Sequence, residues 1–250
     1  MIEGITTGYE ARFDFPVRDG LPRLPWLLAS LPRAGSTWLS HELWACGCLG
    51  APLEYLNFEP GGPYGHAAGR PAEQVDLWRK ALATRTSRNG VFGLKAFPGQ
   101  LHAVQQGNAP LVAQVMRLLL GPASPRKVVD LRRRDRKAHA VSYARALLSG
   151  IWRAEQEREG RDEPAFSALA VERAEAMLDQ QQAAWQAMYA DLGVVPLVLW
   201  FEDALADPAG AVQQVAGYLG VSLDPVAVVA VPTIRQQAQE GARAWLGQLG

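Results

Sequence analysis

Four short apolar runs recur along the chain and alternate with longer stretches of helical periodicity. The runs lie at residues 25–30, 90–97, 127–133 and 196–203. Each is continuously apolar rather than alternating, which is typical of strands that are covered on both faces. Because strands that alternate with helices usually pair in parallel, the pattern predicts an α/β fold with three layers, in which a central parallel sheet is flanked by helices.

The helical stretches have recognisable starts and stops. The predicted helices are residues 36–45, 72–84, 109–120, 135–158, 165–192 and 208–219. The last has Asp207 as N-cap, Pro208 in the first helical position and Gly220 at its exit. No internal repeat and no linker rich in Gly, Pro or Ser divides the chain, so we expect one domain over residues 1–250.

The charge balance and the apolar runs indicate which partners and which cellular location to expect. Lys plus Arg and Asp plus Glu number 25 each, for a formal net charge of +0, whereas nucleic-acid binders usually carry a basic excess. The apolar runs are far shorter than the ~18 residues of a membrane-spanning helix, and the first residues contain no apolar signal core. We therefore expect a cytoplasmic protein with no nucleic-acid partner and no membrane span.

Two cysteines stand close together in ACGCLG. Cys46 and Cys48 are too near in sequence for a relaxed disulfide, and neither a second Cys pair nor a nearby His completes a metal site. We interpret them as buried free thiols at a helix end.

The loop PRAGST, residues 32–37, separates the first predicted strand from a helix. Gly35 lets the backbone approach an anion, and Ser36 and Thr37 bring hydroxyls to a helix N-terminus, where unpaired N–H groups favour a phosphate. Arg33 adds a permanent positive charge. The loop lacks the G-x-x-x-x-G-K-[ST] spacing of a nucleotide-triphosphate loop. A plain strand–helix turn with an N-cap Ser is the alternative interpretation.

A second basic segment follows the third predicted strand. In VVDLRRRDRKAHAVSYARA the strand runs into Arg132, Arg133 and Arg134 before a helix begins near Asp135. Ligands of parallel sheets bind beyond the carboxyl ends of the strands. Two basic loops at neighbouring strand ends favour a ligand with two separated phosphate groups over a solvated charged face.

These two segments resemble the PAPS-dependent sulfotransferases, in which P-x-x-G-[ST]-[ST]-W after the first strand is paired with R-x(8)-S. The resemblance implies a P-loop-like sulfotransferase fold, the donor 3′-phosphoadenosine 5′-phosphosulfate (PAPS), the product 3′,5′-ADP (PAP), and no metal. By position, it implies donor binding by Arg33, Gly35, Ser36, Thr37 and Trp38 around the 5′-phosphosulfate, and by Arg133 and Ser142 at the 3′-phosphate.

The sequence is more specifically similar to the bacterial trehalose 2-sulfotransferase-like family. ASLPRAGSTWL, GAPLEYL, FGLKAF, RRRDRKAHAVSYARA and SGIWRAEQ occur in the family's order, within a similarity that spans about residues 26–245. Ala34 and Ala144 replace a usual Ser and an expected aromatic residue. Residues 1–22 form an N-terminal extension, and residues 56–90 a variable region expected on the acceptor side. The resemblance implies a carbohydrate, trehalose-like, or glycosylated acceptor and a possible homodimer.

Sulfuryl transfer requires positive charge at the sulfonate and the bridging oxygen. Arg33 occupies the position at which many sulfotransferases carry a Lys that contacts this oxygen. Lys95, at the end of the second predicted strand, could neutralise the sulfonate, and preorganised donors of this kind often supply the largest catalytic term. The alternative is that Lys95 is a surface charge at a strand end.

The general base is expected to be a carboxylate. Phe97 stands where many animal cytosolic sulfotransferases have a catalytic His, and the resemblance assigns the base to Glu54 in APLEYL. The apolar neighbours Leu53 and Tyr55 are expected to raise the pKa of Glu54 toward neutrality. His66, in a Gly- and Pro-rich loop, is the alternative base.

Other residues are expected around the acceptor or in the core. Tyr55, His66 and Arg145 are assigned to the acceptor side together with Glu54, and Arg145 and Arg153 are expected on one helix. Trp38, Trp152 and Trp185 are at helical positions that more often face the core than a substrate.

Two other functions are consistent with a phosphate loop. A P-loop kinase is disfavoured by the missing Gly-Lys-[ST] and by the absence of a Mg-binding acid after a later strand. A non-catalytic nucleotide-binding protein would be expected to lack Glu54 or Arg33, and both are present.

Overall fold

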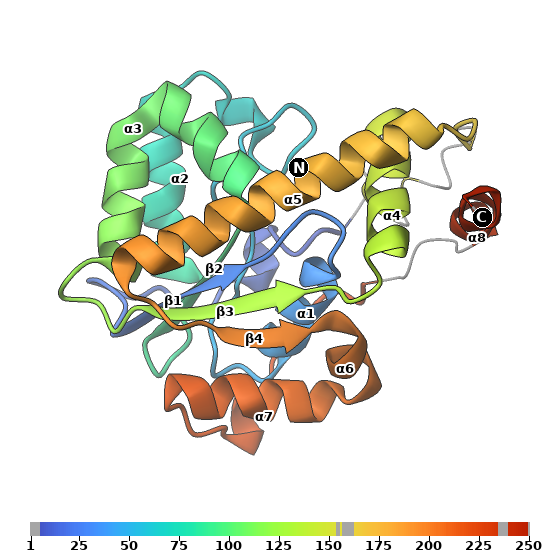
Figure 1. The fold of residues 1–250 in the computed structure, drawn as a ribbon. Helices are drawn as coiled ribbons and strands as arrows, with labels where there is room; N and C mark the ends of the chain where they lie inside the picture. The colour runs from blue at the N-terminus through green and yellow to red at the C-terminus, as the bar shows by residue number, and fades with distance from the viewer. Residues whose placement is uncertain (1–5, 154–155, 157–162, 235–239, 250) are drawn as a thin grey trace.

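The computed structural model describes residues 6–153, 156, 163–234 and 240–249. Among these residues, a parallel sheet has four strands in the order β2-β1-β3-β4 (Figure 1). The strands are β1 (Leu24–Ala29), β2 (Val91–Ala96), β3 (Lys127–Arg132) and β4 (Leu197–Trp200). The α/β class and the parallel sheet are therefore confirmed.

Helices cover both faces of this sheet. They are α1 (Ser36–Ala45), α2 (Pro71–Thr84), α3 (Pro98–Leu120), α4 (Arg136–Ser149), α5 (Ala168–Leu192), α6 (Phe201–Ala206), α7 (Pro208–Leu219) and α8 (Glu240–Gln248). Figure 1 shows α5 crossing one face of the sheet and α7 lying along the other. Short 3-10 turns occur at Ala11–Phe13, Gly65–Ala67 and Pro225–Ala227.

The side chains of β1 alternate between two hydrophobic cores. Leu27 and Ala29 belong to the core shared with α2, α3 and α5, whereas Trp26 and Leu28 belong to the core shared with α1 and α7. All four are at most 1% exposed. Because successive strand residues point to opposite faces, a strand between two helical layers must be apolar at every position. This explains the continuous apolar runs.

Three predicted boundaries were wrong. The predicted strand at residues 196–203 stops at Trp200, and its last residues begin α6. The helix predicted from residue 109 starts at Pro98, and Asn108 forms a non-helical kink inside it. The helix predicted to reach residue 158 stops at Ser149, since Gly150 adopts the left-handed conformation that ends a helix. α8 was not predicted.

The N-terminal segment packs against the sheet domain through a buried arginine. Arg85 is 3% exposed and donates to the carbonyl oxygen of Gly8 at 2.8 Å. It also forms an ion pair with Asp14 at 2.8 Å. The predicted extension therefore approaches the core and the site described below, although its residues 1–5 lie outside the described part of the chain.

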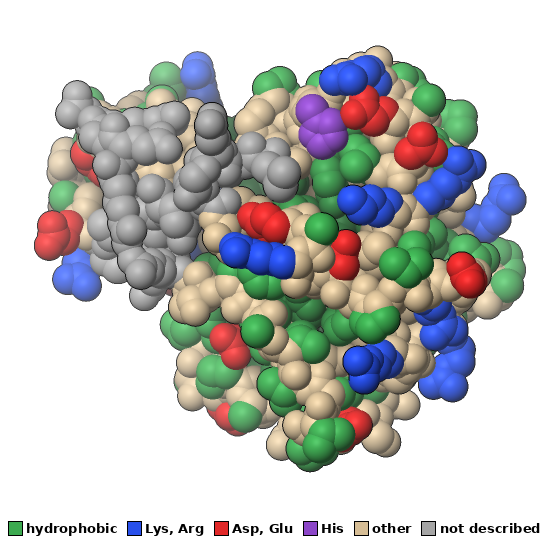
Figure 2. All heavy atoms as spheres, turned by 180° about the vertical axis from the view of Figure 1, so that it is seen from behind, with side chains coloured by type: hydrophobic (Ala, Val, Ile, Leu, Met, Phe, Trp, Pro, Cys, Tyr) green, Lys and Arg blue, Asp and Glu red, His purple; other side chains and the backbone are tan. Residues whose placement is uncertain are grey.

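The surface agrees with the balanced composition. On the face shown in Figure 2, the described basic and acidic side chains are interspersed rather than segregated. Within the described residues, no helix combines the length and the apolar character needed to cross a bilayer.

Candidate active site at the carboxyl ends of the strands

Three predicted segments meet at one edge of the sheet. Because β1 lies between β2 and β3, the loop that follows β1 is flanked by the ends of both neighbours. Lys95 is paired with Leu28 near the end of β2, and Asp130 is paired with Ala29 in β3. The strand order thus confirms that PRAGST, Lys95 and the arginine run share the sheet's carboxyl edge.

The PRAGST loop is tightly folded. Arg33 and Gly35 have φ angles of 68° and 84°, and Gly35 directly precedes the first residue of α1, Ser36. A β-carbon on Gly35 would overlap the Phe201 ring, which approaches from the start of α6. Trp38 packs edge-on against the same ring at 6.0 Å between centroids. A glycine is therefore required at position 35 because the Phe201 ring leaves no room for a side chain and because the backbone there is left-handed.

A buried ion pair connects this loop to the segment after α1. The Nζ of Lys95 lies 2.9 Å from Oε1 of Glu54 and donates to Oγ1 of Thr37 at 2.9 Å. Lys95 is 1% exposed, so the interpretation of Lys95 as a surface charge is wrong. The structure brings Glu54, Lys95 and Thr37 together, as a shared role in one site requires.

Further donors converge on the Glu54 carboxylate. Oε2 accepts hydrogen bonds from Nε2 of Gln100 at 2.6 Å and from Nδ2 of Asn57 at 2.9 Å. The backbone N–H of Glu54 donates to the Tyr9 hydroxyl at 2.9 Å. Sequence reasoning missed Asn57, Gln100 and Tyr9. Gln100 could have been predicted as a site residue from its position, because it lies in the first turn of α3, soon after the strand that carries Lys95.

The expected rise in the pKa of Glu54 is wrong. Burial alone would raise this pKa, but the charge of Lys95 and the hydrogen bonds from Lys95, Gln100 and Asn57 outweigh it, and the pKa lies below its ordinary value. The polar partners of the carboxylate come from outside its own sequence neighbourhood in the case of Lys95 and Gln100. Tyr55 is fully buried and stacks on Phe92, 5.7 Å away, so it is a core residue in this structure.

The pKa of Lys95 is affected by burial and by Glu54 in opposite directions. Burial lowers the pKa of Lys95, and the charge of Glu54 and its hydrogen bond oppose that change. A nearby carboxylate thus supports the charged form of a buried ammonium, which places a cation and an ionised carboxylate side by side.

The predicted donor-binding residues of the second segment also meet the loop. Nε of Arg33 donates to Oγ of Ser142 at 3.1 Å, and its Nη1 donates to the carbonyl oxygen of Trp152 at 2.7 Å. Nη1 of Arg133 donates to the carbonyl oxygen of Arg33 at 3.4 Å. Arg33, Arg133 and Ser142 are therefore close to one another, although they lie far apart in sequence.

Arg133 differs from the other arginines of its segment. Arg132, Arg134 and Arg136 form ion pairs with Asp130, Asp203 and Asp179, respectively. Arg133 forms no ion pair within the described residues, and its buried Nε has no hydrogen-bond partner there. Burial lowers the pKa of Arg133. The charges of Asp135 and Glu202 offset only part of this effect. A partly buried cation without an ion pair favours an incoming anion.

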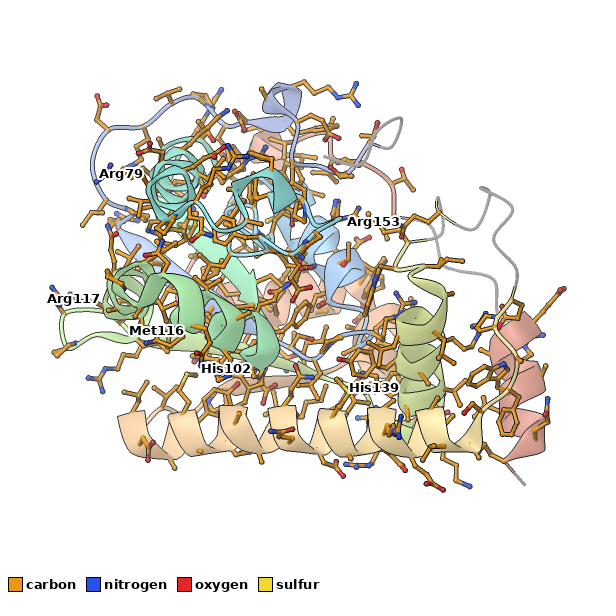
Figure 3. The ribbon with its side chains drawn as sticks, turned by 90° about the horizontal axis from the view of Figure 1, so that it is seen from above. Arg79, His102, Met116, Arg117, His139 and Arg153 are labelled. Atoms are coloured by element: carbon orange, nitrogen blue, oxygen red, sulfur yellow. The ribbon has the colours of Figure 1, made fainter. Side chains whose placement is uncertain are left out.

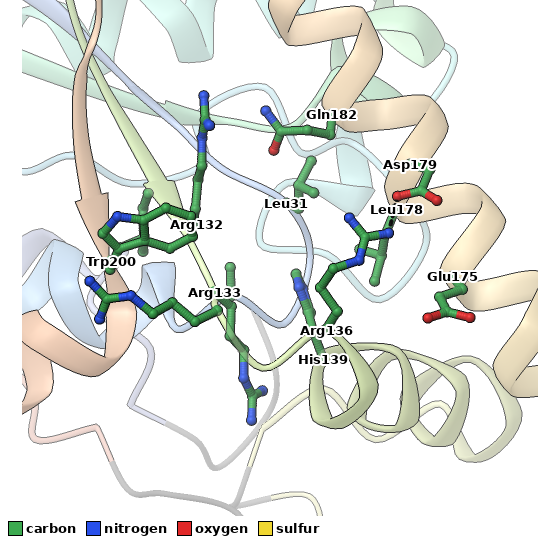
Figure 4. A pocket seen from close by; sticks show the side chains of 13 residues that line it. Leu31, Arg132, Arg133, Arg136, His139, Glu175, Leu178, Asp179, Gln182 and Trp200 are labelled. Atoms are coloured by element: carbon green, nitrogen blue, oxygen red, sulfur yellow. Dashed lines mark hydrogen bonds and ion pairs between the residues drawn. The ribbon is translucent and has the colours of Figure 1, made fainter. Parts of the chain in front are cut away.

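A cavity of about 360 Å³ opens beside this segment, between the ends of β3 and β4 and helix α5 (Figure 4). Arg132 and Arg136 line it, and Arg136 reaches Asp179 on α5 in the same view. Glu54 and Lys95 are not among its lining residues. Arg132, Arg134 and Arg136 of its lining form ion pairs with carboxylates, whereas Arg133, which also lines it, forms none within the described residues.

Two histidines near the loop are buried and held by backbone carbonyls. His41 contacts the oxygen of Thr37 and His139 that of Pro32, each at 2.7 Å. Burial lowers the pKa of both to about 4. They are therefore neutral at pH 7 and fix the backbone of the loop.

His66 and Arg145 form ion pairs of their own with other carboxylates. His66 is 49% exposed in its side chain and lies 3.6 Å from Glu73. Arg145 forms a bidentate pair with Glu163, at 2.6 and 2.8 Å. The expectation that Arg145 and Arg153 share a helix is wrong, because Arg153 lies beyond the end of α4 (Figure 3).

The tryptophans and cysteines divide by burial. Trp185 is 2% exposed and donates to the carbonyl oxygen of Ser30, so it is a core residue. Trp152 is 43% exposed. Both cysteines are free thiols, with Cys48 buried and Cys46 only partly so. Among the described residues, no group of three or more His, Cys, Asp or Glu side chains is arranged to hold a metal ion.

Comparison with known proteins identifies the family. The chain is 25% identical to the trehalose 2-sulfotransferase of Mycobacterium tuberculosis, over 89% of this chain and 92% of that protein. It is likewise 25% identical to the trehalose 2-sulfotransferase of Mycolicibacterium smegmatis, over 88% and 92%. A sulfotransferase structure from Alicyclobacillus acidocaldarius matches 92% of both chains at 18% identity, with a TM-score of 0.49.

The family model of the Stf0 sulphotransferases matches residues 25–249, which is nearly the whole chain. The resemblance seen in the motifs is thereby confirmed, and with it a sulfotransferase activity. The chain belongs to the Stf0 sulphotransferase family.

Proposed function

We propose that this sulfotransferase takes a sulfuryl group from PAPS and transfers it to a hydroxyl of a small carbohydrate, with Glu54 as general base. The observation that carries the proposal is the position of the Lys95 ammonium, which lies within 2.9 Å of both Thr37 in the donor loop and Glu54. A sulfonate held by the loop would thus lie beside a buried cation, with a carboxylate on the other side of that cation.

The reaction follows from this arrangement. The acceptor oxygen forms a bond to sulfur as the bond from sulfur to the bridging phosphate oxygen breaks, and 3′,5′-ADP leaves. The acceptor proton passes to Glu54, whose lowered pKa keeps it ionised at pH 7. Lys95 stabilises the sulfonate charge, and Arg33 stabilises the charge that develops on the bridging oxygen.

The donor's phosphates require two anion sites. Gly35, Ser36 and Thr37 offer backbone and hydroxyl donors at the start of α1 for the 5′-phosphosulfate. Arg133, the arginine of its run without an ion pair in the described chain, and Ser142 would hold the 3′-phosphate. Trp38, which packs against Phe201 beside the loop, would flank the nucleotide.

The acceptor class is inferred from the relatives. Two relatives of similar length are named for trehalose, and the carboxylate with its amide neighbours is a polar site suited to a sugar. We therefore propose trehalose or a similar small carbohydrate as acceptor, with no nucleic acid and no metal in the reaction. The homodimer implied by the resemblance and the cytoplasmic location expected from the sequence stay predictions.

Donor binding provides the first test. Thermal unfolding without Mg²⁺ should show stabilisation by 3′,5′-ADP and none by ATP, because ligands that bind the folded state raise its stability. Labelled PAPS with trehalose should then give a labelled sugar. Stabilisation by ATP would favour a kinase, and binding of 3′,5′-ADP without transfer to any hydroxyl compound would favour a non-catalytic nucleotide-binding protein.

Replacing Arg133 with Ala should weaken 3′,5′-ADP binding by about tenfold to a hundredfold, since a charge-assisted contact to phosphate contributes about 1.5–3 kcal/mol. Binding of an analogue without the 3′-phosphate should change little. Calorimetry with both ligands measures the difference. Arg134→Ala is the matched control, because Arg134 is paired with Asp203 and should leave both affinities unchanged. Equal weakening of the two ligands by Arg133→Ala would show that Arg133 acts on the fold.

Turnover should remain level as pH falls from 8 to about 5. The active form of Glu54 is ionised, and its folded-state pKa lies below the ordinary value of 4.5, so it is protonated less readily than an ordinary glutamate. His41 and His139, with pKa values of about 4, are neutral in the same range. Their lowered pKa values remove stability as pH falls from about 6.5 toward 4, so circular dichroism must accompany each rate. An acid limb at pH 6–7 in a folded protein would argue against Glu54.

A further inference from the structure

We propose that Gln100 binds a second hydroxyl of the acceptor, adjacent to the hydroxyl that is sulfated, and thereby selects vicinal diols such as those of a sugar ring. The inference rests on the proposed function, since it assigns to Glu54 the hydroxyl that attacks. It adds a specificity-determining residue that neither the motifs nor the family's sequence pattern singled out.

The orientation of the Gln100 amide is fixed by its partner. Gln100 lies in the first turn of α3 and is 8% exposed, and its Nε2 donates to Oε2 of Glu54 at 2.6 Å. An ionised carboxylate can only accept hydrogen bonds, so the amide must turn its nitrogen toward Glu54. Its oxygen, Oε1, is therefore left to accept from another donor.

Oε1 of Gln100 is a buried acceptor without a hydrogen-bond partner among the described residues. Two amides nearby, Asn57 and Gln74, have partners at both ends, whereas the oxygen of Gln181, which approaches Gly99, has no hydrogen-bond partner among the described residues. Asn57 donates to Glu54 and accepts from the N–H of Glu59 at 3.3 Å, and Gln74 donates to Ala67 and accepts from Asn108. A buried acceptor left unpaired destabilises a protein, and such atoms in native structures usually have a partner. A hydroxyl of the acceptor would supply it.

The short connection between the two acceptor atoms indicates the class of ligand. Oε1 of Gln100 and Oε2 of Glu54 are linked through one amide group and one hydrogen bond, so the two hydroxyls that they bind must be close neighbours. Adjacent hydroxyls on one ring meet this requirement, whereas a simple alcohol fills only the Glu54 position. An alcohol would leave the Gln100 oxygen buried and unpaired, and sites built to bind a hydroxyl reject analogues that lack it.

The test uses PAPS with trehalose and a panel of trehalose analogues that each lack one ring hydroxyl. In the wild type, one analogue besides that lacking the sulfated hydroxyl should lose about tenfold to a hundredfold in kcat/KM. The Gln100→Met variant should lose a similar factor with trehalose and show no further loss with that analogue, because the shared hydrogen bond is already gone.

Two matched variants separate this role from others. Asn57→Leu removes the second amide donor to Glu54 but leaves Gln100 in place, so it should lower kcat and retain the wild-type sensitivity to the missing hydroxyl. Gln106→Met changes an exposed residue of the same helix and should behave as wild type. The wild-type panel needs no variant, so it remains decisive if Gln100→Met fails to fold.

Three results would overturn the inference: a wild type indifferent to every hydroxyl except the sulfated one, a Gln100→Met variant with undiminished sensitivity, or no transfer to any ring polyol while 3′,5′-ADP still binds. In the last case the proposal that PAPS is the donor would still hold. Loss of both 3′,5′-ADP binding and sulfuryl transfer would instead remove the proposed function itself.

Discussion

Glu54→Gln should lower turnover by about two to four decades while 3′,5′-ADP binding stays near the wild-type level. This range corresponds to about 3–5 kcal/mol of transition-state stabilisation at ~1.4 kcal/mol per decade. The amide cannot take the acceptor proton. It also brings its own N–H donors to a position where Lys95, Gln100 and Asn57 already donate, so one donor must face another.

The same change acts on stability, and a second variant separates the two effects. Removing one partner of a buried ion pair destabilises proteins by about 3–5 kcal/mol, and Lys95 is buried. The double variant with Lys95→Met removes the stranded charge and should recover part of the unfolding midpoint without recovering turnover. Single-turnover rates with trehalose, together with thermal unfolding, measure both. Near-wild-type turnover of Glu54→Gln would exclude it as base and favour His66.

Gly35→Val and Arg33→Ala should fail in different ways. Gly35 has a φ of 84°, and its missing β-carbon points into the Phe201 ring, so valine must displace that ring or unwind the start of α1. Donor binding should then be lost. Arg33→Ala removes hydrogen bonds to Ser142 and Trp152 but leaves the backbone of the loop intact. The Arg33→Ala variant should keep measurable 3′,5′-ADP binding, and its main defect should be a lower turnover rate.

Calorimetry with 3′,5′-ADP and turnover at saturating PAPS distinguish these failures. Gly35→Ala combined with Phe201→Ala is the control for steric overlap, since it opens the space but keeps the left-handed backbone, and it should bind the donor better than Gly35→Ala alone. Normal turnover of Arg33→Ala at saturating PAPS would make Arg33 a binding residue only. Lys95 would then carry the catalytic charge.

Local pattern was sufficient for the fold class and for the family. Apolar runs such as residues 25–30 indicated strands covered on both faces, and their alternation with helices indicated a parallel sheet. The segments that carry PRAGST, Lys95 and the arginine run were therefore expected at the ends of strands, and the order of the motifs indicated the family. Helix ends were less predictable: Gly150 ends α4, but a glycine inside a helical pattern does not reveal its φ angle.

The sequence by itself determined the sheet, the two basic loops and the family, because these follow from local periodicity and from motif order. Tertiary structure decided the chemistry of Glu54. Its apolar neighbours in sequence suggested a raised pKa, yet the carboxylate meets Lys95 from β2 and Gln100 from α3, and its pKa is lowered. It also decided which arginine has no ion pair within the described chain, since the carboxylates that pair with Arg134 and Arg136 come from α6 and α5. Electrostatic energies depend on distances through space, and contacts between residues far apart in the chain appear only after folding.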